Sequence, residues 1–297
     1  MGPIVLKQRV VRPLATDLSA VPLGQSVTVV DIEGGRYVGW RTPAAAAMLA
    51  ACGVWLRCVA GVYGWGAHWI EREADVIGAE WTFWQLADSA FPSGGFAHSA
   101  GLESASQQGL VTDAVSLGWF LESLLQDTAR GVVPFLAAVH SGEQPLCRVD
   151  QWCDAFLTNH VSNRASRVQG RSFLAAAEAA FQIGEIGTLR ERVAAGELNG
   201  HHAVLTGRVT SLLDLPLGRT VAWYLYTQLR DVVSAATRLN IIGPLAGQSL
   251  ISRLGGFVQQ EAETAAQRTV DEVAITSPLL ELVATRHDQL YSRLFQS

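Results

Sequence analysis

A histidine lies beside two serines in the sequence LADSAFPSGGFAHSAGLE, residues 86–103, and this combination could serve a hydrolase. Ser93 and Ser99 are candidate nucleophiles, and His98 is a candidate general base. Such a pair works only when the base is within hydrogen-bond reach and a third group orients it. The spacing supplies no evident carboxylate for that third role. A small-molecule hydrolase that uses His98 and Ser99 is kept as an alternative function.

The histidines and cysteines do not have the spacing of a dedicated metal site. No two of the seven histidines are four residues apart, and the adjacent His201 and His202 would point to different helix faces. The four cysteines form two pairs with five intervening residues each, unlike a zinc knuckle or a CxxC motif. A metal site would need ligands from several helices or from two subunits. We therefore predict no bound metal.

The basic residues exclude several enzyme classes. Lys7 is the only lysine among the 22 basic residues, so the rest of the chain cannot supply a P-loop, Schiff-base or kinase lysine. The GxxxxGK[ST], HExxH and GxSxG motifs are also absent. A net charge of -5 argues against a sequence-independent nucleic-acid binder. Together these observations favour a protein that is not an enzyme and does not bind nucleic acid.

Four basic side chains share one face of a predicted helix. His160, Arg164, Arg167 and Arg171 are spaced at 4, 3 and 4 residues. One interpretation is an ordinary solvated face. The other is a docking strip for an acidic or phosphate-bearing partner, because guanidinium groups bind carboxylates and phosphates in a bidentate manner. The periodicity predicts one long helix from Asp150 to Ile183 that carries this strip.

His98 and Ser99 lie in a break between two predicted helices, residues 92–103, which we call the elbow. Pro92 disfavours helix at the residue before it, and Gly94 and Gly95 permit backbone angles closed to other residues. Phe96 is expected to return to an apolar environment and to begin a second helix. The sequence therefore predicts two helices joined by a tight, glycine-rich junction.

From about Ile70 onward the pattern is helical, and residues 76–297 are predicted to form a compact all-α, multi-helix domain. Its best-patterned helix runs from Arg219 to Leu239, with Arg230 and Arg238 on the exposed side by the helical count. A last helix is predicted from Ser277 to the C-terminus, with an apolar stripe that includes Leu279 and Leu294. That helix either packs on its own domain or inserts into a partner groove.

Residues 1–75 are predicted to be an N-terminal extension of uncertain structure. The runs 27–30 and 37–40 flank Gly34 and Gly35 and suggest a short hairpin. The stretch Pro43 to Ile70 is long and apolar, which keeps a membrane-anchored helical protein as a second alternative. Arg57 near its middle would be costly in lipid, so we expect no membrane association.

Four separated blocks of the chain resemble the urease accessory protein F (UreF) family. They begin with LADSAFPSGGFAHSAGLE and NHVSNRASRVQGRSFL, and continue with RDVVSAATRLNIIGPLAGQSL and RHDQLYSRLFQS. The blocks occur in order over about residues 80–297. The near absence of lysine and the first 75 residues depart from the family pattern.

The resemblance implies an all-helical, dimeric, cytoplasmic urease maturation factor. Proteins of this family link a UreG-type GTPase and a UreD/UreH-type scaffold protein to apo-urease, and they are not enzymes. Nickel would pass through the complex as cargo, with no tightly bound cofactor in this chain. Regulation of the GTPase is a further expected role. If that role needs a lysine in other members, an arginine would replace it here, and Arg230 is the candidate.

The resemblance also implies which residues bind partners. The elbow would shape a GTPase-facing surface, and Arg230 would contact the GTPase. The family's C-terminal block is an interface element, which favours partner binding over self-packing for the last helix. The predicted partner-binding residues are Pro92, Ser93, Gly94, Gly95, Phe96, Ser99, Gly101, Glu103, Arg164, Arg167, Arg171, Arg230, Arg238, His287, Tyr291, Arg293 and Phe295.

Overall fold

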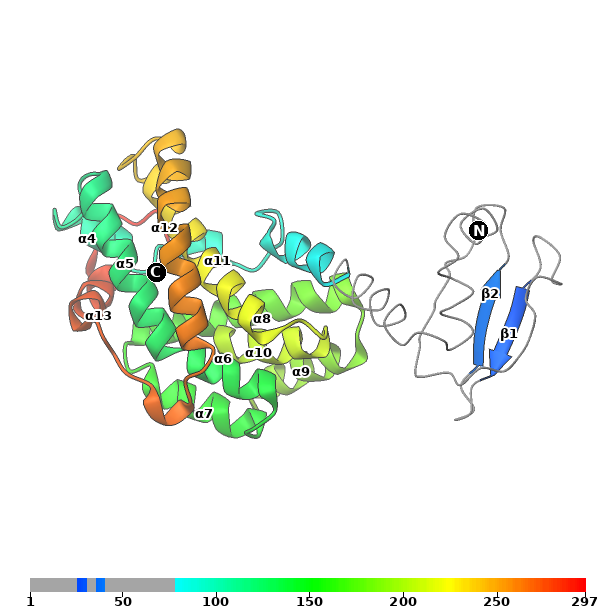
Figure 1. Ribbon diagram of the computed structural model, residues 1–297. Helices are drawn as coiled ribbons and strands as arrows, with labels where there is room; N and C mark the ends of the chain where they lie inside the picture. Colours follow the sequence, from blue (N-terminus) through cyan, green and yellow to red (C-terminus); the bar gives the residue numbers. More distant parts are fainter. Residues whose placement is uncertain (1–25, 31–35, 41–77) are drawn as a thin grey trace. The chain divides into compact units, whose positions relative to one another are not determined.

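The computed structural model describes residues 26–30, 36–40 and 78–297 (Figure 1). The chain divides into two compact units, Met1–Thr82 and Phe83–Ser297. In the first unit, strands β1 (Ser26–Val30) and β2 (Arg36–Trp40) pair antiparallel, with Thr28 opposite Val38. The predicted hairpin is therefore confirmed. The apolar stretch Pro43 to Ile70 lies outside the described residues.

The second unit is all-helical, as predicted. Residues 78–297 contain no strand, and the helices pack in one compact unit from Phe83 onward. Residues 78–87 are helical, and the following elements are η2 Gly95–Ala97, α4 Leu102–Gln107, α5 Ala114–Gly131, α6 Val133–Ser141, α7 Leu146–Phe156, α8 His160–Phe181, α9 Gly184–Ala194, α10 His202–Leu212, α11 Leu217–Arg238, α12 Pro244–Ala265, η3 Val270–Glu272, α13 Pro278–Thr285 and η4 Arg286–Gln289.

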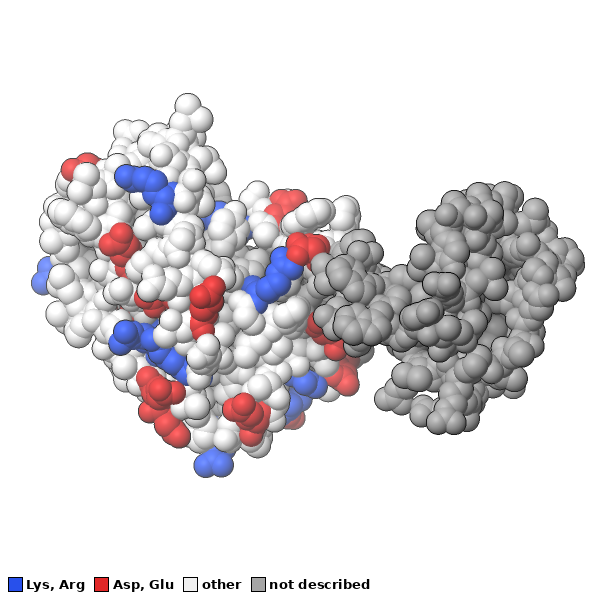
Figure 2. Space-filling model, in the orientation of Figure 1, with Lys and Arg blue, Asp and Glu red and all other residues white. Residues whose placement is uncertain are grey.

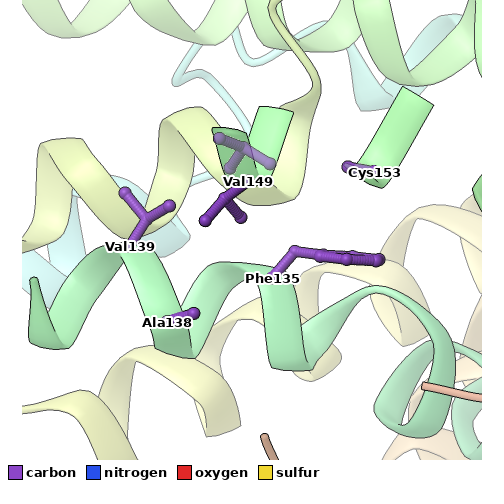
Figure 3. Close-up of a cluster of buried hydrophobic side chains, with 6 residues drawn as sticks. Phe135, Ala138, Val139, Val149 and Cys153 are labelled. Atoms are coloured by element: carbon purple, nitrogen blue, oxygen red, sulfur yellow. The ribbon is translucent and has the colours of Figure 1, made fainter. Parts of the chain in front are cut away.

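The core lies around α6 and α10, which pack against each other. Every residue from Val133 to Val139 in α6 is buried. A cluster of buried side chains joins α6, α7 and α10, and Figure 3 shows Phe135 and Val139 of α6 facing Val149 of α7. Helix α11 lies beside α12 (Figure 1), and its predicted apolar stripe is buried.

The predicted single helix from Asp150 to Ile183 is wrong, because the chain breaks between Phe156 and His160. The side-chain oxygen of Asn159 accepts a hydrogen bond from the amide of Val161 at 2.9 Å and thereby caps a new helix, α8. Leu157 leaves the helical region of backbone angles. The four basic residues predicted to share a face therefore begin at the first turn of α8.

The predicted last helix is also shorter than expected. Helix α13 ends at Thr285, and a 3-10 turn, η4, follows to Gln289. Residues 290–297 are not helical, and Leu294, which the periodicity placed in the apolar stripe of that helix, is exposed. The chain turns extended at Leu290, and the backbone amides of Leu294 and Phe295 bond to the Glu103 side chain instead of to helix carbonyls.

Within the part of the chain that the structure describes, each helix is too short or too polar to cross the hydrocarbon core of a bilayer.

Helices α6 and α10 approach so closely that Gly207 of α10 has no room for a side chain. A Cβ atom at this position would collide with the backbone carbonyl of Leu136 in α6. We expect Gly207→Ala to lower the free energy of unfolding by about 2 kcal/mol, because backbone must shift to relieve the overlap. Urea unfolding followed by circular dichroism measures the change.

The matched control is Gly255→Ala in α12, where an added Cβ meets no atom within 4 Å. That substitution should raise the free energy of unfolding by about 0.5–1 kcal/mol, because alanine loses less backbone entropy than glycine. A Gly207→Ala protein as stable as the wild type would contradict the close packing of α6 on α10.

Candidate interaction site

The elbow has a different backbone path from the one predicted. Only the short turn η2 forms after Gly94, and His98 and Ser99 precede α4 instead of lying within a helix. Gly94 and Gly101 have φ angles of 83° and 84°, a region that glycine adopts without strain. The predicted break at the Pro-Ser-Gly-Gly sequence is present, but the second helix begins six residues later than Phe96, at Leu102.

Two of the elbow glycines allow neighbouring helices to approach. A Cβ on Gly95 would collide with the carboxylate of Asp231 in α11, and a Cβ on Gly101 would lie 3.3 Å from the Cβ of Ala284 in α13. The glycines are therefore needed for the backbone path and for packing. The same contacts fix the elbow between α11 and α13.

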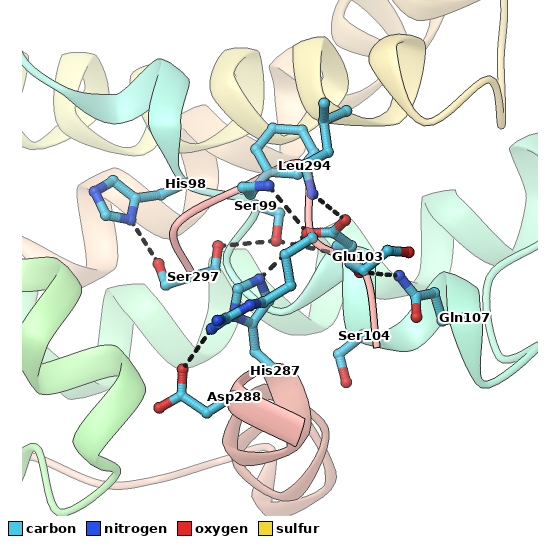
Figure 4. Close-up of polar contacts among 12 residues, drawn as sticks. His98, Ser99, Glu103, Ser104, Gln107, His287, Asp288, Leu294 and Ser297 are labelled. Atoms are coloured by element: carbon cyan, nitrogen blue, oxygen red, sulfur yellow. Dashed lines mark hydrogen bonds and ion pairs between the residues drawn. The ribbon is translucent and has the colours of Figure 1, made fainter. Parts of the chain in front are cut away.

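The last residues of the chain lie along the elbow, and we call residues 286–297 the tail. The amide of Ser99 donates to the backbone oxygen of Ser297 at 2.7 Å, and the amide of Gln296 donates to the carbonyl of Ala97 at 2.9 Å. The Nδ1 atom of His98 lies 2.5 Å from the Ser297 hydroxyl oxygen. Figure 4 shows the tail running next to this segment.

Glu103 is the central acceptor for the tail. Its carboxylate is buried, and it accepts hydrogen bonds from the amides of Leu294 at 2.7 Å and Phe295 at 3.1 Å. The buried Nε2 of His287 lies 3.2 Å from the same carboxylate (Figure 4). A buried carboxylate is tolerated only when such partners replace water. Glu103 therefore fixes the tail on α4.

Arg238 of helix α11 contacts both the elbow and the tail. Its guanidinium carbon lies 3.7 Å from the ring centroid of Phe96 and 4.1 Å from that of Phe295. It also donates a hydrogen bond to the carbonyl of Phe96. Arg238 is only partly exposed, against the expectation that it is exposed, because the two rings cover part of its guanidinium. The arginine instead packs one elbow residue against one tail residue.

Arg230 is likewise directed inward, which corrects its predicted exposure. Its side chain is 17% exposed, and it donates to the carbonyl of Ala87 at 2.7 Å and to Asp231 at 2.8 Å. Burial raises the pKa of Asp231, although the neighbouring Arg230 acts in the opposite direction. In this conformation Arg230 ties the chain before the elbow to α11. Its predicted contact with a GTPase stays a prediction.

Three apolar side chains remain on the outside of this assembly, and we call them the elbow–tail surface. Phe96 is 64% exposed, Leu294 is 59% exposed and Tyr291 is fully exposed. The expectation that Phe96 returns to an apolar environment is not met by its exposed ring, and Leu294, a member of the predicted apolar stripe, is exposed on non-helical backbone. Among the predicted partner-binding residues, Ser99, Glu103, His287 and Phe295 are buried and support this surface from below.

The arrangement does not build a nucleophile from Ser99 and His98. Ser99 is fully buried, and its hydroxyl donates to the backbone oxygen of Ser297 at 3.0 Å. His98 pairs with the Ser297 hydroxyl instead, and its Nε2 has no hydrogen-bond partner. Among the described residues no carboxylate is hydrogen-bonded to the His98 ring, so they do not supply the third group of a triad.

A cavity of about 150 Å³ lies behind the elbow and is lined by His98 and His202 among others. Burial lowers the pKa of each histidine to about 4, so both are neutral near pH 7. Both ring nitrogens of His202 lack hydrogen-bond partners in the part of the chain that the structure describes, and its ring packs against Phe173 and Tyr224. Within the described residues, no group of three histidine, cysteine or acidic side chains could hold a metal ion.

The arginine strip of α8, residues Arg164, Arg167 and Arg171, meets the tail at one end. Arg164 donates two hydrogen bonds to the carboxylate of Asp288, at 2.7 and 3.1 Å, and Arg293 lies 3.3 Å from it. The structure thus brings the elbow, the tail and the start of the strip together. Elsewhere, acidic and basic side chains are interspersed over a mostly uncharged face of the helical unit (Figure 2).

Comparison with known proteins identifies the family. The UreF family model matches residues 111–255. Urease accessory protein F of Arabidopsis thaliana is 38% identical over 223 residues, covering 73% of this chain and 92% of that protein. Urease accessory protein F of Oryza sativa subsp. indica is 36% identical over 219 residues, covering 72% and 84%. The chain belongs to the UreF family.

UreF from Bradyrhizobium diazoefficiens is also similar, with 30% identity over 214 residues, 70% of this chain and 87% of that protein. All three relatives are named as accessory proteins and not as enzymes, which confirms the prediction that this UreF family member is not a catalyst. The match to the family model includes neither the elbow nor the tail, since it begins at residue 111 and ends at residue 255.

Removing the Glu103 carboxylate should release the tail. We expect Glu103→Ala to lower the free energy of unfolding by about 3 kcal/mol, because two amides and His287 lose their buried acceptor. Hydrogen exchange of the Leu294 and Phe295 amides should accelerate. Glu263→Ala, at an exposed site in α12, is the control and should change stability by less than about 0.5 kcal/mol. Unchanged exchange in Glu103→Ala would contradict this role.

The buried histidines predict a loss of stability in mild acid. The folded pKa of His202 is about 4, against 6.5 for the unfolded chain, so the unfolded state binds more protons between these values. Stability is retained above pH 6.5 and falls as the pH drops toward 4. His202 alone should cost about 2 kcal/mol between pH 7 and pH 5.

The measurement is urea unfolding at pH 7 and pH 5. His202→Phe should reduce the difference by about 2 kcal/mol, because the new ring does not titrate. Tyr224→Phe, in the same cavity wall, should keep it, because burial raises the pKa of Tyr224 further above this range. An unaltered pH dependence in His202→Phe would disprove the assignment.

Proposed function

We propose that this chain acts in urease maturation as a non-catalytic factor. In this proposal it links a nickel-delivering GTPase of the UreG type and a scaffold protein of the UreD/UreH type to apo-urease, and it modulates the GTPase. Family membership supports the proposal, since the relatives from rice and Arabidopsis are named urease accessory protein F. A homodimer in the cytoplasm is the form in which we expect it to act.

The observation that carries the proposal is the elbow–tail surface. Phe96 and Leu294 are exposed on backbone that hydrogen bonds to Arg238 and Glu103 hold in place, and Tyr291 is fully exposed three residues before Leu294. Aromatic and apolar anchors on a rigid support are typical of protein interfaces, because little conformational entropy is lost on binding. This favours a preformed docking surface for an assembly partner.

Nickel enters the proposal as cargo and not as a resident cofactor. Neutral imidazole nitrogens are ligands for nickel, and His98 and His202, which line the cavity behind the elbow, carry ring nitrogens without partners among the described residues. The low pKa values keep both rings neutral at physiological pH, which is the form that binds a metal. These features support transient contact with the ion during transfer.

The test is co-expression with the cognate GTPase, scaffold protein and apo-urease, followed by co-purification and nickel-dependent urease activity. The double variant Phe96→Asp/Leu294→Asp should lower co-purification of at least one partner by about tenfold or more, since burying a charge in an apolar interface is unfavourable. Urease activation should fall in parallel.

Ile275→Asp is the control, because Ile275 is an exposed apolar residue outside the elbow and the tail, and it precedes Thr276, whose amide donates to Asp127 of α5. It should keep both association and activation. Association and urease activation that do not depend on the chain at all would overturn the proposed function. Retained association in the double variant would overturn the assignment of the surface.

A further inference from the structure

An open cleft of about 470 Å³ follows α8 and is lined by the arginine strip, with His160 at its beginning. The three arginines cover about 10 Å along the helix axis, given a rise of 1.5 Å per residue. The cleft is open to solvent and lies outside the cavity behind the elbow. The two halves of the cleft differ in whether their basic side chains form ion pairs with a carboxylate of the chain.

The first half already holds a carboxylate of the chain itself. Arg164 contacts both oxygens of Asp288, and His160 Nε2 lies 3.1 Å from one of them. The hydrogen bond from Arg164 holds the pKa of Asp288 below its usual range, so this carboxylate is charged at neutral pH. This half of the strip therefore shows the geometry with which α8 binds an aspartate.

The cations of the second half form no ion pair with a carboxylate of residues 78–297. Within residues 78–297, neither Arg167 nor Arg171 forms an ion pair or a hydrogen bond through its guanidinium group. Asp154 acts on Arg167 through its charge, but its Oδ1 is already used by Asn163 and His201. Two guanidinium groups, one helical turn apart, thus face an open cleft without an acceptor.

We propose that Arg167 and Arg171 form a docking site for an acidic segment of a partner protein. The partner's carboxylates would continue the row that Asp288 begins. The two arginines are about 6 Å apart along the helix, which matches acidic residues at alternate positions of an extended chain, about 6.6 Å apart. The inference goes beyond the proposed role in urease maturation and does not depend on it.

Two observations favour a protein segment over a phosphate-rich polyanion or an anionic membrane. The neighbouring half of the same cleft binds a carboxylate side chain in a bidentate manner. The chain carries a net charge of -5, which repels an extended polyanionic surface at long range. A short acidic segment interacts only with the local positive charge of the arginine strip.

The test uses the full-length chain and a fluorescein-labelled peptide of alternating aspartate and glycine, with binding followed by fluorescence anisotropy at low salt. Arg167→Gln/Arg171→Gln should raise the dissociation constant about tenfold or more, because two charge-assisted contacts are lost. Asp288→Asn should lower it about threefold, because Arg164 is then freed for the peptide. Melting temperatures establish that each variant is folded.

The matched control is Arg253→Gln, which removes an exposed arginine from α12 and should leave the dissociation constant unchanged. No binding of the peptide by the wild type at millimolar concentration would overturn the inference. An equal dissociation constant in the double variant would do the same. Competition by millimolar inorganic phosphate at equal strength, or preferred binding to phosphatidylserine vesicles, would assign the strip to another ligand.

Discussion

The buried carboxylate of Glu103 sets the arrangement of the tail. A charge in this position must be matched, and the available donors are the amides of Leu294 and Phe295 together with His287. Because two of these donors are backbone groups, the tail cannot remain helical where it meets α4. The same match positions Phe295, whose ring contacts the Arg238 guanidinium that also contacts the ring of Phe96.

Arginine supplies the other polar connections of the helical unit. Arg238 lies between two rings, Arg230 binds a carbonyl and a carboxylate at once, and Arg164 holds both oxygens of Asp288. Each role uses the planar shape and the several donors of a guanidinium group, which a lysine ammonium lacks. The near absence of lysine is therefore compatible with a well-connected structure.

Local sequence patterns predicted those parts of the structure that depend on local forces. The apolar stripe of α11, the hairpin before residue 41 and the break at Pro92 follow from side-chain periodicity and backbone restrictions. The tail, the inward path of Arg230 and Arg238, and the exposure of Phe96 depend on partners far away in sequence. The break before α8 could have been found, since Asn159 is a favourable N-cap residue. The sequence pattern did not predict that the elbow, the tail and the arginine strip lie close together. The spacing of residues within one helix carries no information about which other segment packs against it.

The pairing of elbow and tail joins residues that are almost the whole helical unit apart. Ser99 bonds to Ser297 over a separation of 198 residues. Synthesis proceeds at roughly 5–20 residues per second. The elbow therefore leaves the ribosome well before the tail residues that bond to it have been made. Until the tail has been synthesised, Glu103 and Phe96 lack their partners in the tail. Chaperone contacts on the emerging chain would act at this segment first, and the elbow would reach its final form among the last events of folding.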